Sequence, residues 1–287
     1  FVAHWQEAAA LADVIDPASI AVLHGIAPGE EGIAASLGAV PVLNSEAQVA
    51  RWRAMGGGRC HVMIDTGMNR LGLRHDAPLG DLLAGLDIDI CMSHLASADD
   101  TSTQNAAQQS RYVAVMREVR ARRYSLANSA GVALGADYAF DLTRPGLALY
   151  GGVPCAALAG VIRPVMTLEA RILQVRDVRA GETVGYGATF TAPADMRTAT
   201  VALGYADGYK RALSGLGRFR HGDALLPVIG RVSMDLTCVD ISRALDLHEG
   251  DWLHCDLDLA AAEAMTGISQ YEWLTQIGHR FDRVWQD

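Results

Sequence analysis

Lysine is the scarcest charged residue of this chain, because Lys210 is the one lysine among 24 lysines and arginines in 287 residues. Any chemistry that needs a lysine amine must therefore use Lys210 or a residue outside this stretch. Lys210 stands beside Arg211 in the second half of the chain, where we expect a solvent-exposed side chain.

Cysteine and histidine are present without the spacings that carry special chemistry. The five cysteines are odd in number and form no C-x-x-C pair, so we expect buried free thiols in a reducing compartment, which favours the cytoplasm. The nine histidines show no metal-ligand spacing, so no metal site is expected. The cysteines are Cys60, Cys91, Cys155, Cys238 and Cys255.

An excess of cations and a membrane-spanning run are both missing. The net charge of −9 argues against nucleic acid or an anionic membrane as the main partner. The uncharged stretch at residues 145–162 contains prolines and glycines, which suit turns better than a membrane helix. We interpret it as a strand end and a linker between domains, and we expect no membrane partner.

What is present fits a globular protein of two domains, because 50% of the residues are hydrophobic and 20% are charged. Residues 1–152 alternate short β-rich runs with helical runs, which predicts an α/β domain with a parallel sheet. Strands are predicted at residues 1–4, 20–23, 40–43, 61–64, 88–93, 124–127 and 140–143. Helices are predicted at residues 5–14, 30–37, 46–55, 78–85 and 104–122. These strands are one fewer than the eight that close a (β/α)₈ TIM barrel.

Residues 153–287 have a different pattern. Alternating runs at 165–178, 198–203 and 228–241 are separated by turn residues, which predicts a mostly antiparallel β domain. Helices are expected near its end, at residues 259–265 and 271–277.

Several segments carry polar residues in a fixed order along the chain. They are IDTGMNRLG at 64–72, SHLASAD at 93–99, ANSAG at 127–131, RPGLALYG at 144–151, GYGAT at 185–189, GYADGY at 204–209 and GRVSMD at 230–235. Together they resemble alanine racemase, a fold-type III enzyme that depends on pyridoxal phosphate. Short matches arise by chance, but an ordered set over most of a chain does not.

The resemblance implies a (β/α)₈ TIM barrel followed by the β domain. The family's opening strand carries a lysine in a segment like VKANAYG, and residues 1–4 already resemble the second strand. We therefore expect these residues to lack the first βα unit and the lysine that bonds to the cofactor, and to show no racemisation by themselves.

The resemblance also implies an isomerase that interconverts L- and D-alanine with two opposed bases, one tyrosine and one lysine. Its partners would be a small amino-acid substrate and a second copy of the chain, in a cytoplasmic homodimer with shared active sites. D-alanine biosynthesis for peptidoglycan precursors is the expected role.

Three residues are assigned to catalysis by the resemblance: Arg144, His94 and Tyr186. Arg144 would face the ring nitrogen of the cofactor, where a guanidinium can only donate and so leaves that nitrogen unprotonated. His94 would lie against the cofactor ring and link Arg144 to Tyr186. A tyrosine acts as a base only beside positive charge, because its ordinary pKa is about 10.

The remaining assignments concern cofactor and substrate. Ser129, Tyr271, Tyr205 and the amides of Gly146 and Leu147 would bind the cofactor, chiefly at its phosphate.

Arg70, Asp235 and the Met234 amide would bind the substrate carboxylate. The chain departs from the family here, because Met63 stands where many members have a carbamylated lysine that orients the arginine, and Asn69 replaces the usual glycine. Either another polar group steadies Arg70 or substrate binding differs.

Position supports these assignments independently of the motifs. Asp65, His94, Asn128, Ser129 and Arg144 each follow a predicted strand, and the carboxyl ends of barrel strands are where TIM-barrel sites are built. Three alternatives remain open: a racemase for another small amino acid such as serine, a decarboxylase of the same fold type, or a non-catalytic protein that binds pyridoxal phosphate or a partner.

Overall fold

The computed structural model describes residues 1–286 and divides them into two compact units. Unit 1 comprises Phe1–Gly146 and Pro154–Ala157, and unit 2 comprises Leu147–Val153 together with the rest of the chain from Leu158. The chain thus passes between the units around the boundary at 152/153 proposed from the sequence.

Unit 1 is built on a parallel sheet with the strand order β1-β2-β3-β5-β6. The five strands are Ala21–Val22 (β1), Val40–Leu43 (β2), Arg59–Asp65 (β3), Asp87–Met92 (β5) and Arg123–Ser125 (β6). A short strand, Leu73–Arg74 (β4), also pairs with β3. The strands are buried on both faces, as parallel sheets require, and the five predicted near these positions are confirmed.

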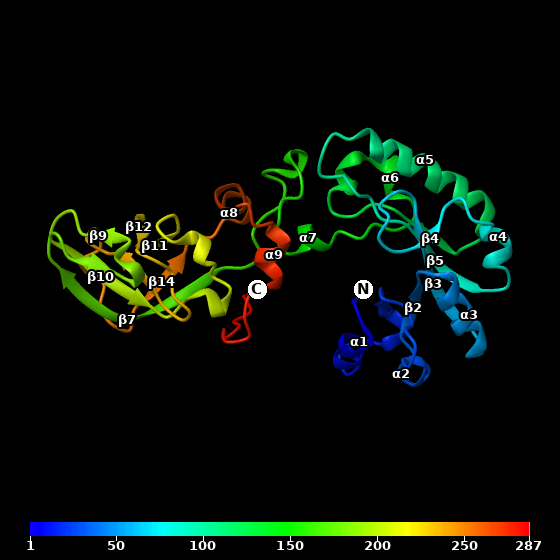
Figure 1. Cartoon of the computed structure of the whole chain (residues 1–287), viewed down its shortest axis with the longest axis horizontal. Helices are drawn as coiled ribbons and strands as arrows, with labels where there is room; N and C mark the ends of the chain where they lie inside the picture. The colour runs from blue at the N-terminus through cyan, green and yellow to red at the C-terminus, as the bar shows by residue number, and fades with distance from the viewer. Residues whose placement is uncertain (287) are drawn as a thin grey trace. The chain divides into compact units, whose positions relative to one another are not determined.

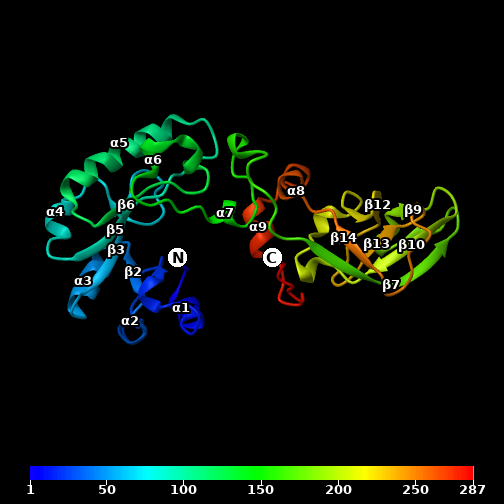
Figure 2. The same ribbon diagram turned by 180° about the vertical axis from the view of Figure 1, so that it is seen from behind.

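Helices cover one face of this sheet (Figures 1 and 2). They are Trp5–Leu11 (α1), Glu31–Leu37 (α2), Glu46–Ala54 (α3), Leu79–Leu82 (α4) and Thr103–Glu118 (α5). Ser45 and Ser102 cap α3 and α5, because each hydroxyl accepts a hydrogen bond from an amide of the first turn. Helix α5 ends before residue 122 as Val119 is extended, so its predicted end was wrong.

The other face of the sheet carries a small apolar cluster. Ala21, Val42, Met63, Ile90 and Met92 point to it, and all five are buried. Alternate residues of β3, namely Cys60, Val62 and Ile64, point instead to the helices.

Two of the predicted strands are wrong. Residues 1–4 form only one bridge, between Val2 and Val22, before α1 begins at Trp5. Residues 140–143 follow the short helix Ala136–Ala139 (α6), and Phe140 has φ 51°, which a strand does not allow. The chain rejoins the sheet at Arg144, which bridges Asn128.

Unit 2 is centred on a closed barrel of six strands in the order β10-β13-β12-β11-β14-β7, each antiparallel to its neighbours. The strands are Leu168–Val178 (β7), Met196–Val201 (β10), Arg218–His221 (β11), Ala224–Ile229 (β12), Thr237–Asp240 (β13) and Trp252–Cys255 (β14). The predicted antiparallel β domain is confirmed. A two-stranded ribbon, Thr183–Val184 (β8) and Phe190–Thr191 (β9), extends from it.

Two helices, Leu259–Thr266 (α8) and Gln270–Thr275 (α9), complete unit 2 where they were predicted. The stretch at residues 145–162 contains no strand but two short helical segments, Gly146–Leu149 (α7) and Ala156–Leu158. Within residues 1–286, no helix has the length and apolar character needed to cross a membrane.

Candidate active site

Arg144 is anchored in unit 1 by its backbone and by its guanidinium. Its amide donates to the carbonyl of Ala127 (2.9 Å), and its guanidinium donates to Ser125 Oγ and to the carbonyl of Ser93. Burial lowers the pKa of Arg144 to about 10, so the side chain remains a cation at neutral pH. Its Nε–H donates to no residue within 1–286, so this donor is available to an acceptor such as a ring nitrogen.

His94 lies two residues beyond β5 and is partly buried. Burial, with smaller contributions from Arg144 and Arg70, lowers the pKa of His94 to about 4, so its ring is neutral at pH 7. Arg144 donates to the carbonyl of Ser93, the residue before His94, and the Ser93–Thr66 contact joins the His94 loop to the loop of Arg70, so the three residues lie in one region of unit 1. Within residues 1–286 no hydrogen bond joins the His94 ring to Arg144, so that direct contact stays a prediction.

Arg70 is exposed and sits on a loop that Asp65 folds. Asp65 Oδ1 accepts hydrogen bonds from the amides of Gly67 (2.9 Å), Met68 (2.9 Å) and Asn69 (3.1 Å). Asn69 has φ 57°, in the left-handed region that asparagine tolerates better than most residues. Asparagine at this position therefore fits the backbone conformation that the loop adopts.

The Arg70 loop forms one wall of a cavity of about 420 Å³. The other wall comes from the end of β2 and the start of α3. The lining residues are Asn44, Ser45, Gln48, Asp65, Asn69, Arg70, Leu71 and Gly72. Arg70 gives the cavity a cation suited to a carboxylate group.

Ser129 and Gly146 also lie in unit 1. Ser129 is buried, and a single 3-10 turn, Gly131–Leu134, follows it. The Gly146 amide donates to the carbonyl of Arg144 (3.0 Å).

Tyr271 and Leu147 lie together in unit 2. The Leu147 amide donates to the Tyr271 hydroxyl (3.3 Å), which projects from α9 with half of the side chain exposed. A hydroxyl and a backbone amide meeting at one point can both donate to an anion.

Tyr186 is 72% exposed and begins the short turn Tyr186–Ala188. It is flanked by Gly185 (φ 77°) and Gly187 (φ 71°), a conformation that glycine adopts without steric cost. Val184, two residues before Tyr186, packs closely on Gly230, where an added Cβ would lie 2.6 Å from the Val184 carbonyl oxygen. The Tyr186 loop is therefore held against the segment that leads to Met234.

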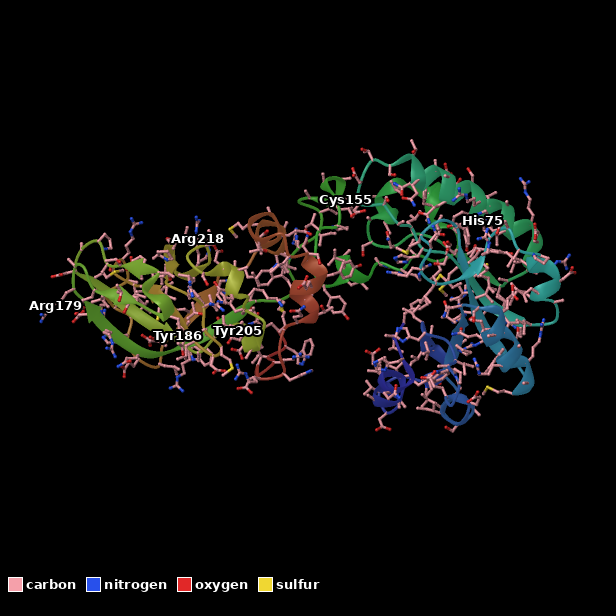
Figure 3. All side chains as sticks on the ribbon, viewed as in Figure 1. His75, Cys155, Arg179, Tyr186, Tyr205 and Arg218 are labelled. Atoms are coloured by element: carbon pink, nitrogen blue, oxygen red, sulfur yellow. The ribbon has the colours of Figure 1, made fainter. Side chains whose placement is uncertain are left out.

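Tyr205 and Met234 are on two loops joined by backbone hydrogen bonds, from Tyr205 N to the Ser233 carbonyl (3.1 Å) and from Ala206 N to the Met234 carbonyl (2.9 Å). Figure 3 shows Tyr205 and Tyr186 in unit 2. The Met234 amide itself donates to no residue within 1–286, and the side chain is 54% exposed.

Asp235 is tied to the Tyr205 loop by an arginine. Arg280 donates to Asp235 Oδ1 and, through Nε, to Asp207 Oδ1, both at 2.8 Å. Asp207 Oδ2 in turn accepts from the Gly204 amide (2.9 Å).

Sequence reasoning missed the residues that support the site. Ser125 and Ser93 hold Arg144, Gln108 holds the loops of unit 1, and Arg280 links those of unit 2. Ser93 stands in a motif next to His94, but its carbonyl oxygen makes the contact, and no side-chain pattern reveals that.

Both halves of the chain match models of known domains: the alanine racemase N-terminal domain over residues 1–154 and the C-terminal domain over residues 165–285. An alanine racemase of Acidiphilium cryptum is 42% identical over 99% of this chain and 83% of the relative. A catabolic alanine racemase of Agrobacterium fabrum is 41% identical over 99% of this chain and 77% of the relative.

Solved structures agree with these matches. Alanine racemase from Bartonella henselae with covalently bound pyridoxal phosphate has a TM-score of 0.88 at 32% identity, covering 99% of this chain and 84% of that one. Biosynthetic alanine racemase from Pseudomonas aeruginosa has a TM-score of 0.87 at 31% identity, covering 100% of this chain and 84% of that one.

Proposed function

The chain belongs to the alanine racemase family, and from that premise we propose that it serves an isomerase that interconverts L- and D-alanine with pyridoxal phosphate. The observation that carries the proposal is the grouping of Arg144, His94 and Arg70 in unit 1: a cation, a neutral imidazole and a second cation beside a cavity. The TIM-barrel-like domain followed by a β domain is the fold of the relatives.

The residues present fit the cofactor. The Tyr271 hydroxyl and the Leu147 amide meet at 3.3 Å, and with Ser129 and the Gly146 amide they would hold its phosphate. The Nε–H of Arg144 would donate to its ring nitrogen. Pyridoxal phosphate supplies the electron sink that stabilises the α-carbon after its proton leaves.

The substrate would be held at its carboxylate by Arg70 and by the Met234 amide, which has no partner among the described residues. Tyr186 would take the α-proton of L-alanine through its phenolic oxygen, and in the reverse direction it would deliver a proton to the same face to form L-alanine. Tyr205 would line the same pocket, and Asp235 would flank the carboxylate.

The opposing base would be a lysine, and Lys210 does not fit that role. Its amine donates to Gln276 Oε1 at the surface of unit 2.

We also propose a homodimer in which unit 2 of one copy completes the site of the other. Support comes from Tyr186, Tyr205 and Met234, which lie on neighbouring loops and are 72%, 46% and 54% exposed, because a cluster of exposed apolar side chains marks an interaction surface. A cytoplasmic enzyme that supplies D-alanine for peptidoglycan precursors is consistent with this assembly and with the five free cysteines.

The test is Tyr186→Phe in the full-length protein loaded with pyridoxal phosphate. The phenol is lost while the ring stays, so exchange of the α-proton of L-alanine in deuterated water should slow by about 10²–10⁴-fold. Exchange from D-alanine should slow less, because the other base removes that proton. Serine assayed in parallel would show whether alanine is the preferred substrate.

Tyr138→Phe is the matched control, because it removes a phenol that packs against the core of unit 1 and has no assigned role in the site, and it should leave both rates unchanged. Equal exchange rates in wild type and Tyr186→Phe would eliminate Tyr186 as the base.

A further inference from the structure

Buried polar side chains of helix α5 lie against two loops of the candidate site. One loop follows β3 and carries Arg70, and the other follows β5 and carries His94. Gln108 is 0% exposed and Asn105 is 4% exposed, which is unusual for amide side chains and requires hydrogen-bond partners.

Gln108 has those partners, and they belong to both loops. Its Nε2 donates to Thr66 Oγ1 (3.2 Å) and to the His94 carbonyl (2.9 Å), while its Oε1 accepts from the Ala96 amide (2.9 Å). Thr66 Oγ1 also lies 2.7 Å from Ser93 Oγ, so the two loops are joined directly beside the amide.

Neighbouring turns of α5 repeat the pattern. Gln104 donates to the Gly67 carbonyl (3.0 Å) and accepts from Ser97 Oγ (2.8 Å), so it also spans both loops. Arg111 donates to the Thr66 carbonyl (2.8 Å). Residues 104, 108 and 111 are three or four positions apart and thus share one face of the helix.

Nothing polar holds the Arg70 loop from the opposite side at position 63. Met63 is 9% exposed and packs with Val42, Ile90 and Met92 in the apolar cluster. A thioether is a poor hydrogen-bond acceptor, so Met63 cannot orient a guanidinium as a charged group would.

We propose that Gln108 is a positioning residue that fixes the spacing between the Arg70 loop and the His94 loop. This inference rests on the proposed function for its kinetic consequence, but its structural part does not. Arg70 then owes its placement to the fold of its own loop, capped by Asp65 and fastened to α5, and needs no partner at position 63.

The expected kinetic effect follows from geometry. Small displacements of a substrate-positioning group cost up to about 100-fold in rate, so losing the Gln108 bonds should lower kcat/KM for alanine about 10- to 100-fold. The change should lie mainly in KM, because Arg70 binds the substrate carboxylate and takes no proton.

The experiment compares Gln108→Met with Gln109→Met in the full-length protein. Methionine matches the length of glutamine without its donor and acceptor. Gln109 is the adjacent helix residue, and its Nε2 reaches only the Asp137 carbonyl (3.4 Å), away from both loops. Amide hydrogen exchange is measured by region, alongside kcat and KM.

In Gln108→Met, amides of residues 67–69 and of Ala96 should exchange faster together, while Gln109→Met should leave both loops unchanged. Faster exchange in neither loop, or in one loop alone, would overturn the proposal. If wild type fails to racemise alanine, the proposed function falls, and the exchange comparison still decides the positioning role.

Gln108→Glu separates positioning from folding. Its protonated carboxyl keeps a donor and an acceptor, and burial raises the pKa of a carboxyl group, so kcat/KM relative to wild type should recover as pH falls. A ratio that does not change with pH would contradict the proposed geometry.

Discussion

The two units hold their candidate site loops by different means. In unit 1 the loops of Arg70 and His94 are joined through Gln108, a neutral side chain with no exposed surface. In unit 2 the loops of Tyr205 and Asp235 are joined through Arg280, whose side chain is 52% exposed between two carboxylates. Salt hardly affects hydrogen bonds between buried neutral groups, but it screens exposed ion pairs. Added salt should therefore weaken the loop contacts of unit 2 more than those of unit 1.

The two units also differ in the burial of their histidines. His61 is 4% exposed in unit 1, and its Nδ1 accepts from the Ile90 amide (3.2 Å) next to an irregularity in the pairing of β3 with β5. Among the described residues, no histidine of unit 2 is buried. Acid should therefore act on unit 1 first.

The largest effect expected from this contrast is acid destabilisation of unit 1. Burial, opposed by Asp89, lowers the pKa of His61 to about 4, while an unfolded histidine titrates near about 6.5. The unfolded chain then binds the proton more readily, so the free energy of unfolding should fall by about 3 kcal/mol as pH drops from 6.5 to 4. Below pH 4 this contribution should level off.

Hydrogen exchange at several pH values, read separately for β3–β5 and for the barrel of unit 2, measures this fall. His61→Asn keeps an acceptor for the Ile90 amide without a titratable ring, so it should reduce the pH dependence in unit 1 and leave the part that comes from His94, whose pKa is also lowered to about 4. An equal decline in both units, unchanged in the variant, would break the comparison.

A smaller effect is expected from Tyr112→Phe. The Tyr112 hydroxyl is fully buried, donates to the Cys91 carbonyl (2.6 Å) and accepts from the Ser125 amide (2.9 Å). Removing it leaves two buried groups unpaired, which should destabilise unit 1 by about 1–3 kcal/mol. Urea unfolding measures the loss. Tyr124→Phe is the control and should cost less, because the Tyr124 side chain is only partly buried.

The smallest effect is expected from Arg280→Met, which removes the two ion pairs of Arg280 in unit 2. The pKa of Arg280 is raised by its hydrogen bonds with Asp235 and Asp207, and solvent screens the pair with the exposed Asp235 more than the pair with the buried Asp207. KM for alanine should rise only about two- to fivefold. The difference from wild type should shrink in 1 M salt, while the effect of Gln108→Met should not. A salt-independent loss would show that Arg280 acts by packing.

Much of the fold could be predicted because most sheet strands of unit 1 are short apolar runs and helices follow β1, β2 and β5. The strand predicted at residues 140–143 was wrong for a local reason. The sequence Phe-Asp-Leu-Thr is typical of a strand, but the left-handed backbone at Phe140 turns the chain before Arg144. The short strands β11 and β14 were missed because the runs around Phe219 and Leu253 contain arginine, histidine and tryptophan on their outer face.

The site was predictable where motifs place side chains at strand ends, as for His94 and Arg144. The residues that hold the site loops could not be predicted. A glutamine in a helix is normally exposed to solvent, and only the tertiary contacts of Gln108 reveal that its side chain is buried. Arg280 is similarly invisible, because its partners Asp207 and Asp235 are far away in sequence.

The left-handed backbone of Asn69 also limits how this loop can change over generations. Asparagine and glycine codons differ by two bases, so drift between them passes through serine or aspartate. Serine lacks the tolerance of asparagine and aspartate for φ near 57°. Aspartate keeps the backbone, yet it brings a carboxylate into the cavity beside Arg70, where it would compete with the ligand for the guanidinium. Serine would strain the backbone and aspartate would compete for Arg70. Replacement of asparagine by glycine at this position should therefore be rare.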